Sequence, residues 1–405
     1  MNNMAQNIAK YLSIEITESL IPLYDKNTYT LDSRGNIIKL YLKEVQLDKP
    51  SILIELHEHL KVLSLFDCGI KDMEFINNFT FLEELDLRIN PINNLKGIAG
   101  LTALKKLNLG ATHISSVDEL KALEKLEFLG LSSCINSFSL LALENLKNLK
   151  ELNLSTSPVN NIDAIPVLDS LKVLNLRESE LNDIRGLRKF VNLEELNLSN
   201  NNISNINELI HLTFLKDLDL SDNPLSKIST LKDLDSLQYL NLLGVGLDEF
   251  HDLANLVELE QLDLGYNNIK KIQHLDKLVH LKELSLARNQ IITIEGLDNL
   301  QNLEILMLQG NKIHTIQNIP RNRLKYLNIS LNQIKEVQEL EYEHLEKIYL
   351  SVNKIEEINA SIINQLPDHS MIDIRKNNIK KISGEIRKEV KLKIQGEVDV
   401  IPFGL

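Results

Sequence analysis

A line of eleven residues recurs along this chain about every 22 residues, with leucine or isoleucine at the same places each time. Three examples are LKELSLARNQI at Leu281–Ile291, LEQLDLGYNNI at Leu259–Ile269 and LEELNLSNNNI at Leu193–Ile203. Self-similarity at a fixed short period is typical of stacked arrays, in which one unit buries its apolar side only against its neighbours. The 405 residues are therefore expected to form one elongated array, although the length alone would suggest two or three globular domains.

The first apolar residue of each line marks the start of a repeat. Most starts are 22 residues apart, and the others are 21 to 24 residues apart. The starts are Ile37, Leu60, Leu82, Leu104, Leu126, Leu149, Leu171, Leu193, Leu215, Leu237, Leu259, Leu281, Leu303, Leu324 and Leu345. A sixteenth line begins at His369, and a degenerate line follows around Leu392 and Ile394. We predict an array of about 16 repeats over 37–388, an N-terminal cap over 1–36 and a C-terminal cap over 389–405.

The full pattern identifies a family resemblance. It is L-x-x-L-x-L-x-x-N-x-I-x-x-I-x-x-L-x-x-L, and it is met by Leu281, Leu284, Leu286, Asn289, Ile291, Ile294, Leu297 and Leu300. This resembles the leucine-rich repeat family, and the period is similar to that of a phosphatase-1 regulatory subunit and of bacterial internalins. The resemblance implies an α/β solenoid, an arc with a concave parallel β-sheet and convex 3₁₀ or short-helix turns. Such a match carries the fold, whereas it does not carry the function.

The residue pattern leads to the same architecture without the family. In L-x-L the leucines alternate with polar residues, which predicts a short strand with its leucines pointing inward. More than ten residues separate one strand from the next, so neighbouring strands must run parallel. The threefold spacing of Ile294, Leu297 and Leu300 suits 3₁₀ turns on the opposite side.

The ninth position of the line is polar and has a structural explanation. A buried asparagine there can bond backbone N–H and C=O groups where the strand ends. Smaller polar residues in the fourth to seventh lines can do part of this, and Val245, between two glycines, is expected to break the ladder. The asparagines are Asn90, Asn201, Asn223, Asn267, Asn289, Asn311, Asn332, Asn353 and Asn377, and the smaller residues are Thr112, Cys134, Ser157 and Ser179.

The N-terminal cap has two predicted parts. Alternating runs on either side of Asp32–Asn36 predict a hairpin that closes the first strand. The preceding segment, 7–24, is expected to be helical and to pack over that hairpin.

Charge and hydropathy limit the partners. The net charge of −13 argues against a duplex nucleic-acid binder, which needs a basic stripe. No stretch reaches the ~18 apolar residues of a membrane span, and the N-terminus lacks the pattern of a secretory leader. We therefore expect a cytoplasmic protein that binds neither nucleic acid nor membrane and is a monomer on its own.

A search for reaction chemistry finds little. The phosphate-binding motifs G-x-x-x-x-G-K and G-x-G-x-x-G and the zinc motif H-E-x-x-H are all missing, so we expect no catalytic residues, no cofactor and no metal site. His57-x-His59 resembles a metal pair, but a turn before Leu60 explains it as well. Cys68 and Cys134 fall three repeats apart, roughly 14 Å at strand spacing, which is too far for a disulfide.

Two patterns lie on the strands. At the second position, charges of alternating sign form a row that we interpret as a device for register and solubility. On the open face the polar pattern is interrupted by large apolar residues, which are predicted to bind a partner or else only to stack on one another. This C-terminal apolar cluster comprises Tyr239, Leu243, Tyr266, Ile305, Met307, Tyr326, Leu331, Tyr349 and Val352. A weaker N-terminal group is Val62, Phe66, Ile89 and Phe128.

The sequence therefore favours a non-enzymatic module that binds a protein partner on its concave face. An acidic block beside the C-terminal apolar cluster would complement a basic partner, and it comprises Glu194, Glu195, Asp217, Asp219, Asp222 and Asp263. Two alternatives remain: a regulatory subunit that docks on a phosphatase or other enzyme, and an internalin-like secreted effector or adhesin.

Overall fold

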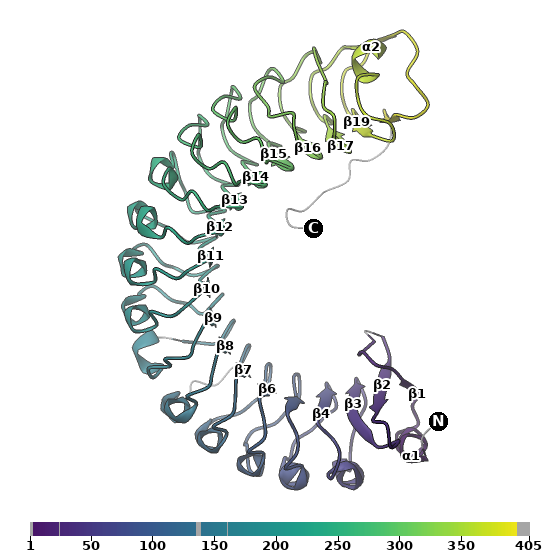
Figure 1. Ribbon diagram of the computed structural model, residues 1–405, viewed down its shortest axis with the longest axis vertical. Coiled ribbons are helices and arrows are strands. Elements are labelled where there is room, and N and C mark those ends of the chain that lie inside the picture. Colours follow the sequence, from purple (N-terminus) through teal and green to yellow (C-terminus); the bar gives the residue numbers. More distant parts are fainter. Residues whose placement is uncertain (1–2, 24, 135–138, 160, 395–405) are drawn as a thin grey trace. The chain divides into compact units, whose positions relative to one another are not determined.

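The computed structural model describes residues 3–23, 25–134, 139–159 and 161–394, in two compact units, 1–201 and 202–405. In each unit, short strands lie along one side of the repeats and the helical or irregular turns lie on the other (Figure 1). The architecture is an α/β solenoid with a mostly parallel sheet, as the repeat pattern predicts.

Unit 1 begins with a helix and a hairpin and continues with one strand per repeat. Strands β3 to β10 pair in parallel and in sequence order. The elements are α1 (Asn3–Leu12), β1 (Ile16–Glu18), β2 (Asn27–Leu31), β3 (Ile37–Lys43), β4 (Val62–Phe66), β5 (Glu84–Asp86), β6 (Lys106–Asn108), β7 (Phe128–Gly130), β8 (Glu151–Asn153), β9 (Val173–Asn175) and β10 (Glu195–Asn197). Between them lie the 3₁₀ turns η1 (Pro50–Leu56), η2 (Glu74–Asn78), η3 (Ile98–Gly100), η4 (Asp118–Ala122), η5 (Leu141–Asn145), η6 (Ile162–Ala164) and η7 (Arg185–Lys189).

Unit 2 continues the same pattern, but among its described residues the 3₁₀ turns lie only between 207 and 253. The turns are η8 (Asn207–His211), η9 (Ser229–Asp233) and η10 (His251–Leu253). The strands are β11 (Asp217–Asp219), β12 (Tyr239–Asn241), β13 (Gln261–Asp263), β14 (Glu283–Ser285), β15 (Ile305–Met307), β16 (Tyr326–Asn328), β17 (Lys347–Tyr349), β19 (Met371–Asp373) and β21 (Lys391–Lys393). A separate pair, β18 (Glu357–Asn359) and β20 (Lys381–Ser383), flanks the short helix α2 (Ala360–Ile363).

The core is a stack of the repeated leucines. Each strand points its fourth-position leucine inward, and Leu107, Leu240 and Leu284 are all 0% exposed. Because each such leucine touches the repeats on both sides, truncation of one to alanine should cost about 2–5 kcal/mol.

The asparagine ladder is confirmed. The Asn289 amide donates hydrogen bonds to the carbonyls of Leu264 at 2.9 Å and Leu286 at 3.1 Å, and its oxygen accepts one from the Ile269 N–H at 3.0 Å. One side chain therefore bonds the backbone of its own turn and of the preceding repeat. The Thr112 and Ser157 hydroxyls take over part of this task by donating to Leu109 and Leu131.

Val245 interrupts the ladder as predicted. Its side chain is 2% exposed and has no polar atom, so it cannot bond the preceding turn. There the Leu225 N–H donates to the Asn223 carbonyl instead, at 2.9 Å. Gly244 and Gly246 on either side both adopt positive φ, at 68° and 88°.

The eighth position has a backbone feature that the sequence did not reveal. It lies in the left-handed region in line after line, although the residue is seldom glycine; Ile89 (58°), Tyr266 (53°) and Val352 (55°) are examples. The left-handed turn lets its N–H donate to the next repeat, as Tyr266 does to the Ala287 carbonyl at 2.8 Å. This bond offsets part of the strain that side chains other than glycine bear there.

The N-terminal cap confirms one prediction and corrects another. The hairpin is present, because β2 pairs antiparallel with β3 around the Asp32–Asn36 turn. The helix expected over 7–24 is wrong: helix α1 ends at Leu12, and β1 instead adds a strand parallel to β2. The strand Ile16–Glu18 is only three residues long, so its apolar–polar alternation is too short to predict a strand. Tyr24, at the end of the expected helix, lies outside the described residues.

The last repeats depart from the pattern. His369, placed at an inward position by the spacing, is exposed and has a φ of 70°. The next residue, Ser370, is buried instead and its hydroxyl donates to the Leu345 carbonyl at 2.6 Å. The degenerate line forms β21, which pairs with β19. Residues 395–405 of the predicted C-terminal cap lie outside the described residues.

Candidate binding surfaces

The charged row at the second position forms ion pairs between adjacent repeats. Glu83 lies 3.4 Å from Lys61 and 2.7 Å from Lys105, and Lys282 lies 2.6 Å from Glu260. These side chains are partly exposed to solvent, which screens the charges, so each pair adds little to stability. The pairing between adjacent repeats supports the interpretation of this row as a device for register.

Side chains that bind metal ions are dispersed over the part of the chain that the structure describes. No cluster of three or more His, Cys, Asp or Glu side chains suited to a metal ion occurs there. His57 follows η1 and its ring nitrogen Nδ1 lies 2.8 Å from the Ile54 carbonyl oxygen, which is a turn position. Cys68 and Cys134 are both buried free thiols, and burial raises the pKa of Cys68 to about 11. A thiol with that pKa is protonated at neutral pH and is a poor nucleophile.

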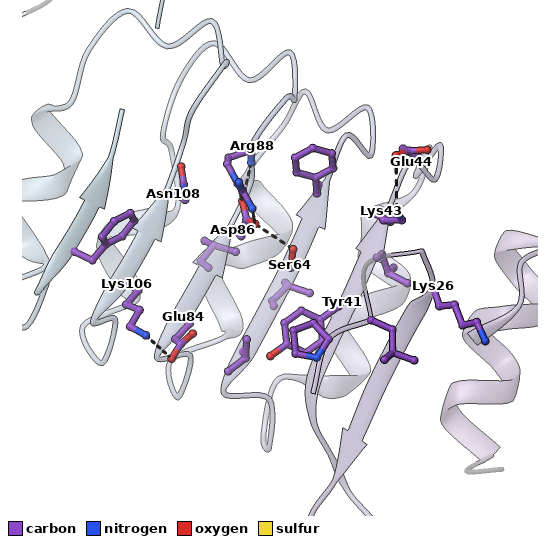
Figure 2. Close-up of a pocket in the computed structure, with 18 residues that line it drawn as sticks. Lys26, Tyr41, Lys43, Glu44, Ser64, Glu84, Asp86, Arg88, Lys106 and Asn108 are labelled. Atoms are coloured by element: carbon purple, nitrogen blue, oxygen red, sulfur yellow. Dashed lines mark hydrogen bonds and ion pairs between the residues drawn. The ribbon is translucent and has the colours of Figure 1, made fainter. Parts of the chain in front are cut away.

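A hollow of 630 Å³ lies on the open face of unit 1, at its N-terminal end (Figure 2). Its walls come from strands β3 to β7 and from the segment between β1 and β2. That segment contributes Pro22, Leu23 and Lys26, so the cap overhangs the sheet there. The hollow lies wholly within unit 1.

The floor of the hollow is apolar. Val62 is 9% exposed, and Phe66 and Phe128 are half-buried, with part of each ring facing solvent. These are three of the four residues of the N-terminal group that the sequence singled out. The fourth, Ile89, is 45% exposed at a left-handed eighth position and is not among the residues that line the hollow.

Charged groups surround that floor. Arg88 binds Asp86 through two hydrogen bonds, at 3.0 and 2.8 Å, and its guanidinium lies 5.2 Å from the centre of the Phe66 ring. The bond to Asp86 raises the pKa of Arg88 above its ordinary value. Lys106 lies 3.3 Å from Glu84. Burial, and secondarily the Glu84 charge, raises the pKa of Tyr41, whose hydroxyl therefore remains a donor at neutral pH.

An apolar pair projects beside the hollow. Leu20 is 83% exposed and Ile21 is 66% exposed, and they directly precede the lining residues Pro22 and Leu23. The Ser19 hydroxyl donates to the Ile21 carbonyl at 2.6 Å, which holds this loop in a fixed turn. Two adjacent large aliphatic side chains held in solvent indicate an interaction surface.

The C-terminal apolar cluster lies in unit 2, and its members have unequal exposure. Tyr326 and Tyr349, on the adjacent strands β16 and β17, have ring centres 5.3 Å apart. Tyr349 is 7% exposed and Met307 is 3% exposed, whereas Tyr239, Leu243, Ile305 and Val352 are half-buried. Tyr266 and Leu331, at left-handed eighth positions, are 60% and 37% exposed. The tyrosine stacking is therefore present, and a binding role for the cluster stays a prediction.

The acidic block is divided between the units. Glu194 and Glu195 belong to unit 1, where Glu194 lies 3.0 Å from Lys172. Asp217, Asp219, Asp222 and Asp263 belong to unit 2. Asp219 accepts hydrogen bonds from the Ser221 N–H and hydroxyl, and Asp263 is buried, which raises its pKa. Asp219 and Asp263 thus have local structural roles, and a role of the block towards a basic partner stays a prediction.

The sequence predicted apolar residues that form the floor of the hollow, but it did not predict the hollow itself. Phe66 and Phe128 interrupt the polar pattern, and this could be recognised from the repeat alignment. The position of Pro22, Leu23 and Lys26 at the hollow could not, because it depends on how a cap outside the repeat packs. The exposed pair Leu20–Ile21 is visible as an apolar run, but only the structure shows that it lies beside the hollow.

Within the described residues, no helix has both the length and the apolarity to cross a membrane. The family model described as leucine rich repeats (two copies) matches residues 257–299 and 279–321, and one described as leucine rich repeat matches residues 192–212. A search of the curated proteins found no match.

Solved structures of similar fold come from several organisms. An internalin from Listeria monocytogenes has a TM-score of 0.61 and 26% identity, over 74% of this chain and 83% of that one. A repeat protein from Leptospira interrogans has a TM-score of 0.68 and 26% identity, over 82% of this chain and 94% of that one. The ectodomain of the Arabidopsis thaliana receptor kinase GASSHO1/SCHENGEN3, solved with CASPARIAN STRIP INTEGRITY FACTOR 2, has a TM-score of 0.61 and 20% identity, over 86% of this chain and 54% of that one.

Proposed function

Because this chain is a leucine-rich repeat protein, we propose that it is a non-enzymatic interaction module that binds a protein partner on the open face of its sheet. The hollow in unit 1 is the observation that carries this proposal. A repeat array without an assembled set of reactive groups offers surface rather than catalysis.

The physical argument rests on side chains left partly in water. Phe66 and Phe128 expose part of their rings to the hollow, and Leu20 and Ile21 project beside it. Covering this surface releases about 25 cal/mol for each Å² of apolar area. Aromatic anchors in a concave site with a polar rim are the usual centre of a protein interface.

The fold can hold such a partner. The Arabidopsis ectodomain of similar fold was solved in complex with a separate factor, which supports a binding role for a fold of this kind. The lining residues extend from Phe128 on strand β7 to Pro22, Leu23 and Lys26 of the cap loop, so one partner segment would contact both elements.

Site-directed photo-crosslinking tests the proposal. A benzoyl-phenylalanine replaces Phe128 on the open face or, as the control, Leu141 on the 3₁₀ side, where that residue is 66% exposed. We expect one saturable crosslinked protein with the probe at position 128 and none with the probe at 141. Capture by the control position alone would refute open-face binding.

A second candidate is an internalin-like secreted effector or adhesin, which the likeness to the Listeria internalin favours. This second candidate differs from the first in its location, because we propose that the interaction module is cytoplasmic. Fractionation of the source cells with an antibody to the chain separates the two: recovery from the medium or the cell surface supports the second candidate.

A further inference from the structure

Ion pairs join the charged side chains that line the hollow in unit 1. The pairs are Arg88–Asp86 at 2.8 Å, Lys106–Glu84 at 3.3 Å and Lys43–Glu44 at 4.0 Å. Lys26 is the remaining charged residue among the described lining residues. Its side chain is directed away from Tyr41 (Figure 2), and it also borders a second recess together with Glu15 and Asp25. Positive and negative charges on the floor of the hollow are therefore balanced within the protein.

A row of four residues in register crosses that floor. Each is paired with the next on the adjacent strands β4, β5, β6 and β7, and they are Val62, Glu84, Lys106 and Phe128. Apolar side chains lie at both ends of this row, and the ion pair lies between them. Phe66 adds a second apolar side chain on β4. At about 4.8 Å per strand, the two apolar ends are roughly 14 Å apart.

The balance of charge selects against a charged group of a partner. A carboxylate or an ammonium group that enters the hollow loses water, and it gains an opposite charge only by breaking an existing pair. An uncharged segment bears neither cost. Its apolar side chains would cover the parts of Phe66 and Phe128 that face solvent, which stabilises the complex.

We propose that the hollow binds an extended, uncharged segment of a protein partner through two bulky apolar side chains four residues apart. An extended chain advances about 3.3 Å per residue, so residues i and i+4 lie on one face and are about 13 Å apart, which matches the spacing from β4 to β7. One of these side chains contacts Val62 and Phe66, and the other contacts Phe128. The residues between them cross the pair of Glu84 and Lys106. This inference rests on the proposed function and deepens it, because it names the chemistry and the spacing of the partner segment.

Selection from a phage-displayed library of random peptides tests this chemistry on the full chain. We expect enriched peptides with bulky apolar residues at i and i+4 and no charged residue between them. Their affinity should change by less than about twofold between about 50 and about 500 mM salt, because no ion pair forms across the interface. Phe128→Ser should weaken these peptides about tenfold or more. Leu141→Ser, on the 3₁₀ side, should leave them unchanged.

Two substitutions test the balance of charge itself. Glu84→Gln leaves the Lys106 ammonium without its partner, so a second selection should enrich peptides with Asp or Glu between the two apolar residues. Lys106→Met leaves the Glu84 carboxylate unpaired and should enrich Lys or Arg there. Lys105→Met is the matched control, because it breaks the pair with Glu83 outside the hollow and should still select uncharged peptides.

The outcomes separate this inference from the proposed function. Wild-type selection of charged peptides, or of a spacing other than four, would overturn the inference, but the proposed function stands if those peptides lose binding on Phe128→Ser. Identical selections by the wild type, Glu84→Gln and Lys106→Met would also overturn the inference. If no peptide is enriched, or if none responds to Phe128→Ser, both proposals fail. Thermal melts of each variant exclude loss of fold as the cause.

Discussion

At the scale of single residues, the ninth-position asparagine explains why so short a strand can be stacked so often. A strand of three residues leaves most of its turn without sheet partners. Asn289 compensates by bonding the carbonyls of Leu264 and Leu286 and the N–H of Ile269. Serine or threonine can replace only part of this, since a hydroxyl has one donor where the amide has two. The Ser157 hydroxyl donates to the Leu131 carbonyl and accepts from the Cys134 N–H.

Asn289→Ala is therefore expected to destabilise the protein by about 1–3 kcal/mol, because buried backbone groups lose their partners. Urea denaturation followed by circular dichroism measures the change. Asn299→Ala is the matched control, because that amide donates a 3.3 Å hydrogen bond at an exposed position. Equal midpoints for the two variants would refute the account of the ladder.

Asp263 gives stability an unusual dependence on pH. Burial raises the pKa of its carboxyl above 3.8, so the folded protein holds the proton more tightly than the unfolded chain does. Stability is then lost as pH rises from the unfolded pKa through the raised folded pKa. Asparagine, which several other lines have at this position, can accept the same hydrogen bond from the Gly265 N–H without that loss.

Asp263→Asn should consequently raise the melting temperature at about pH 7 and lose most of this advantage at about pH 3, where the wild-type carboxyl is protonated. Melts of both proteins across this range measure the difference. An advantage that is equally large at both pH values would show that ionisation of Asp263 is not its cause.

At the scale of elements, the same strand positions do different work in different repeats. On β16 and β17 the open-face positions carry Tyr326 and Tyr349, which stack across the strands. On β4 and β7 they carry Phe66 and Phe128, which line a hollow because the cap loop stands over them. The neighbouring element decides whether such a ring stacks on another ring or lines a hollow, and a repeat pattern does not contain that information.

Tyr349→Ala should lower stability by about 3 kcal/mol, since the ring is 7% exposed and its removal leaves a cavity. Tyr266→Ala, at a side chain that is 60% exposed, should change stability by no more than ~0.5 kcal/mol. Denaturation midpoints test both. If Tyr349→Ala melts like the wild type, the stack does not hold the strands together and the ring is available to a partner.

The elements also show where prediction from sequence ends. Strands, inward leucines and the asparagine ladder follow from the repeat, because each depends on contacts that recur at a fixed spacing. The hairpin follows from two alternating runs on either side of a short turn. The strand Ile16–Glu18, the turn at His369 and the cap residues that line the hollow do not recur. The left-handed eighth position does recur, but its residues range from Gly310 to Val352, so no residue type marks it.

At the scale of the whole molecule, the repeat supplies a surface and the irregular parts make it specific. In the regular repeats the charged side chains are paired and the amide side chains are hydrogen-bonded, so few of these groups remain to bind a partner. The hollow and the exposed Leu20–Ile21 pair both depend on the cap. The repeat pattern predicted the class of protein, whereas the position of the hollow required the structure.

The most direct test of open-face binding is a titration with the partner that crosslinking identifies. The purified partner is titrated against matched variants of the open face and of the 3₁₀ side. Phe128→Ser should weaken binding by about tenfold or more, the equivalent of ~1.4 kcal/mol, because it removes an apolar anchor of the hollow. Leu141→Ser, on the 3₁₀ side, should bind like the wild type. Loss of binding in Leu141→Ser together with full binding by Phe128→Ser would contradict the assignment of the partner to the open face.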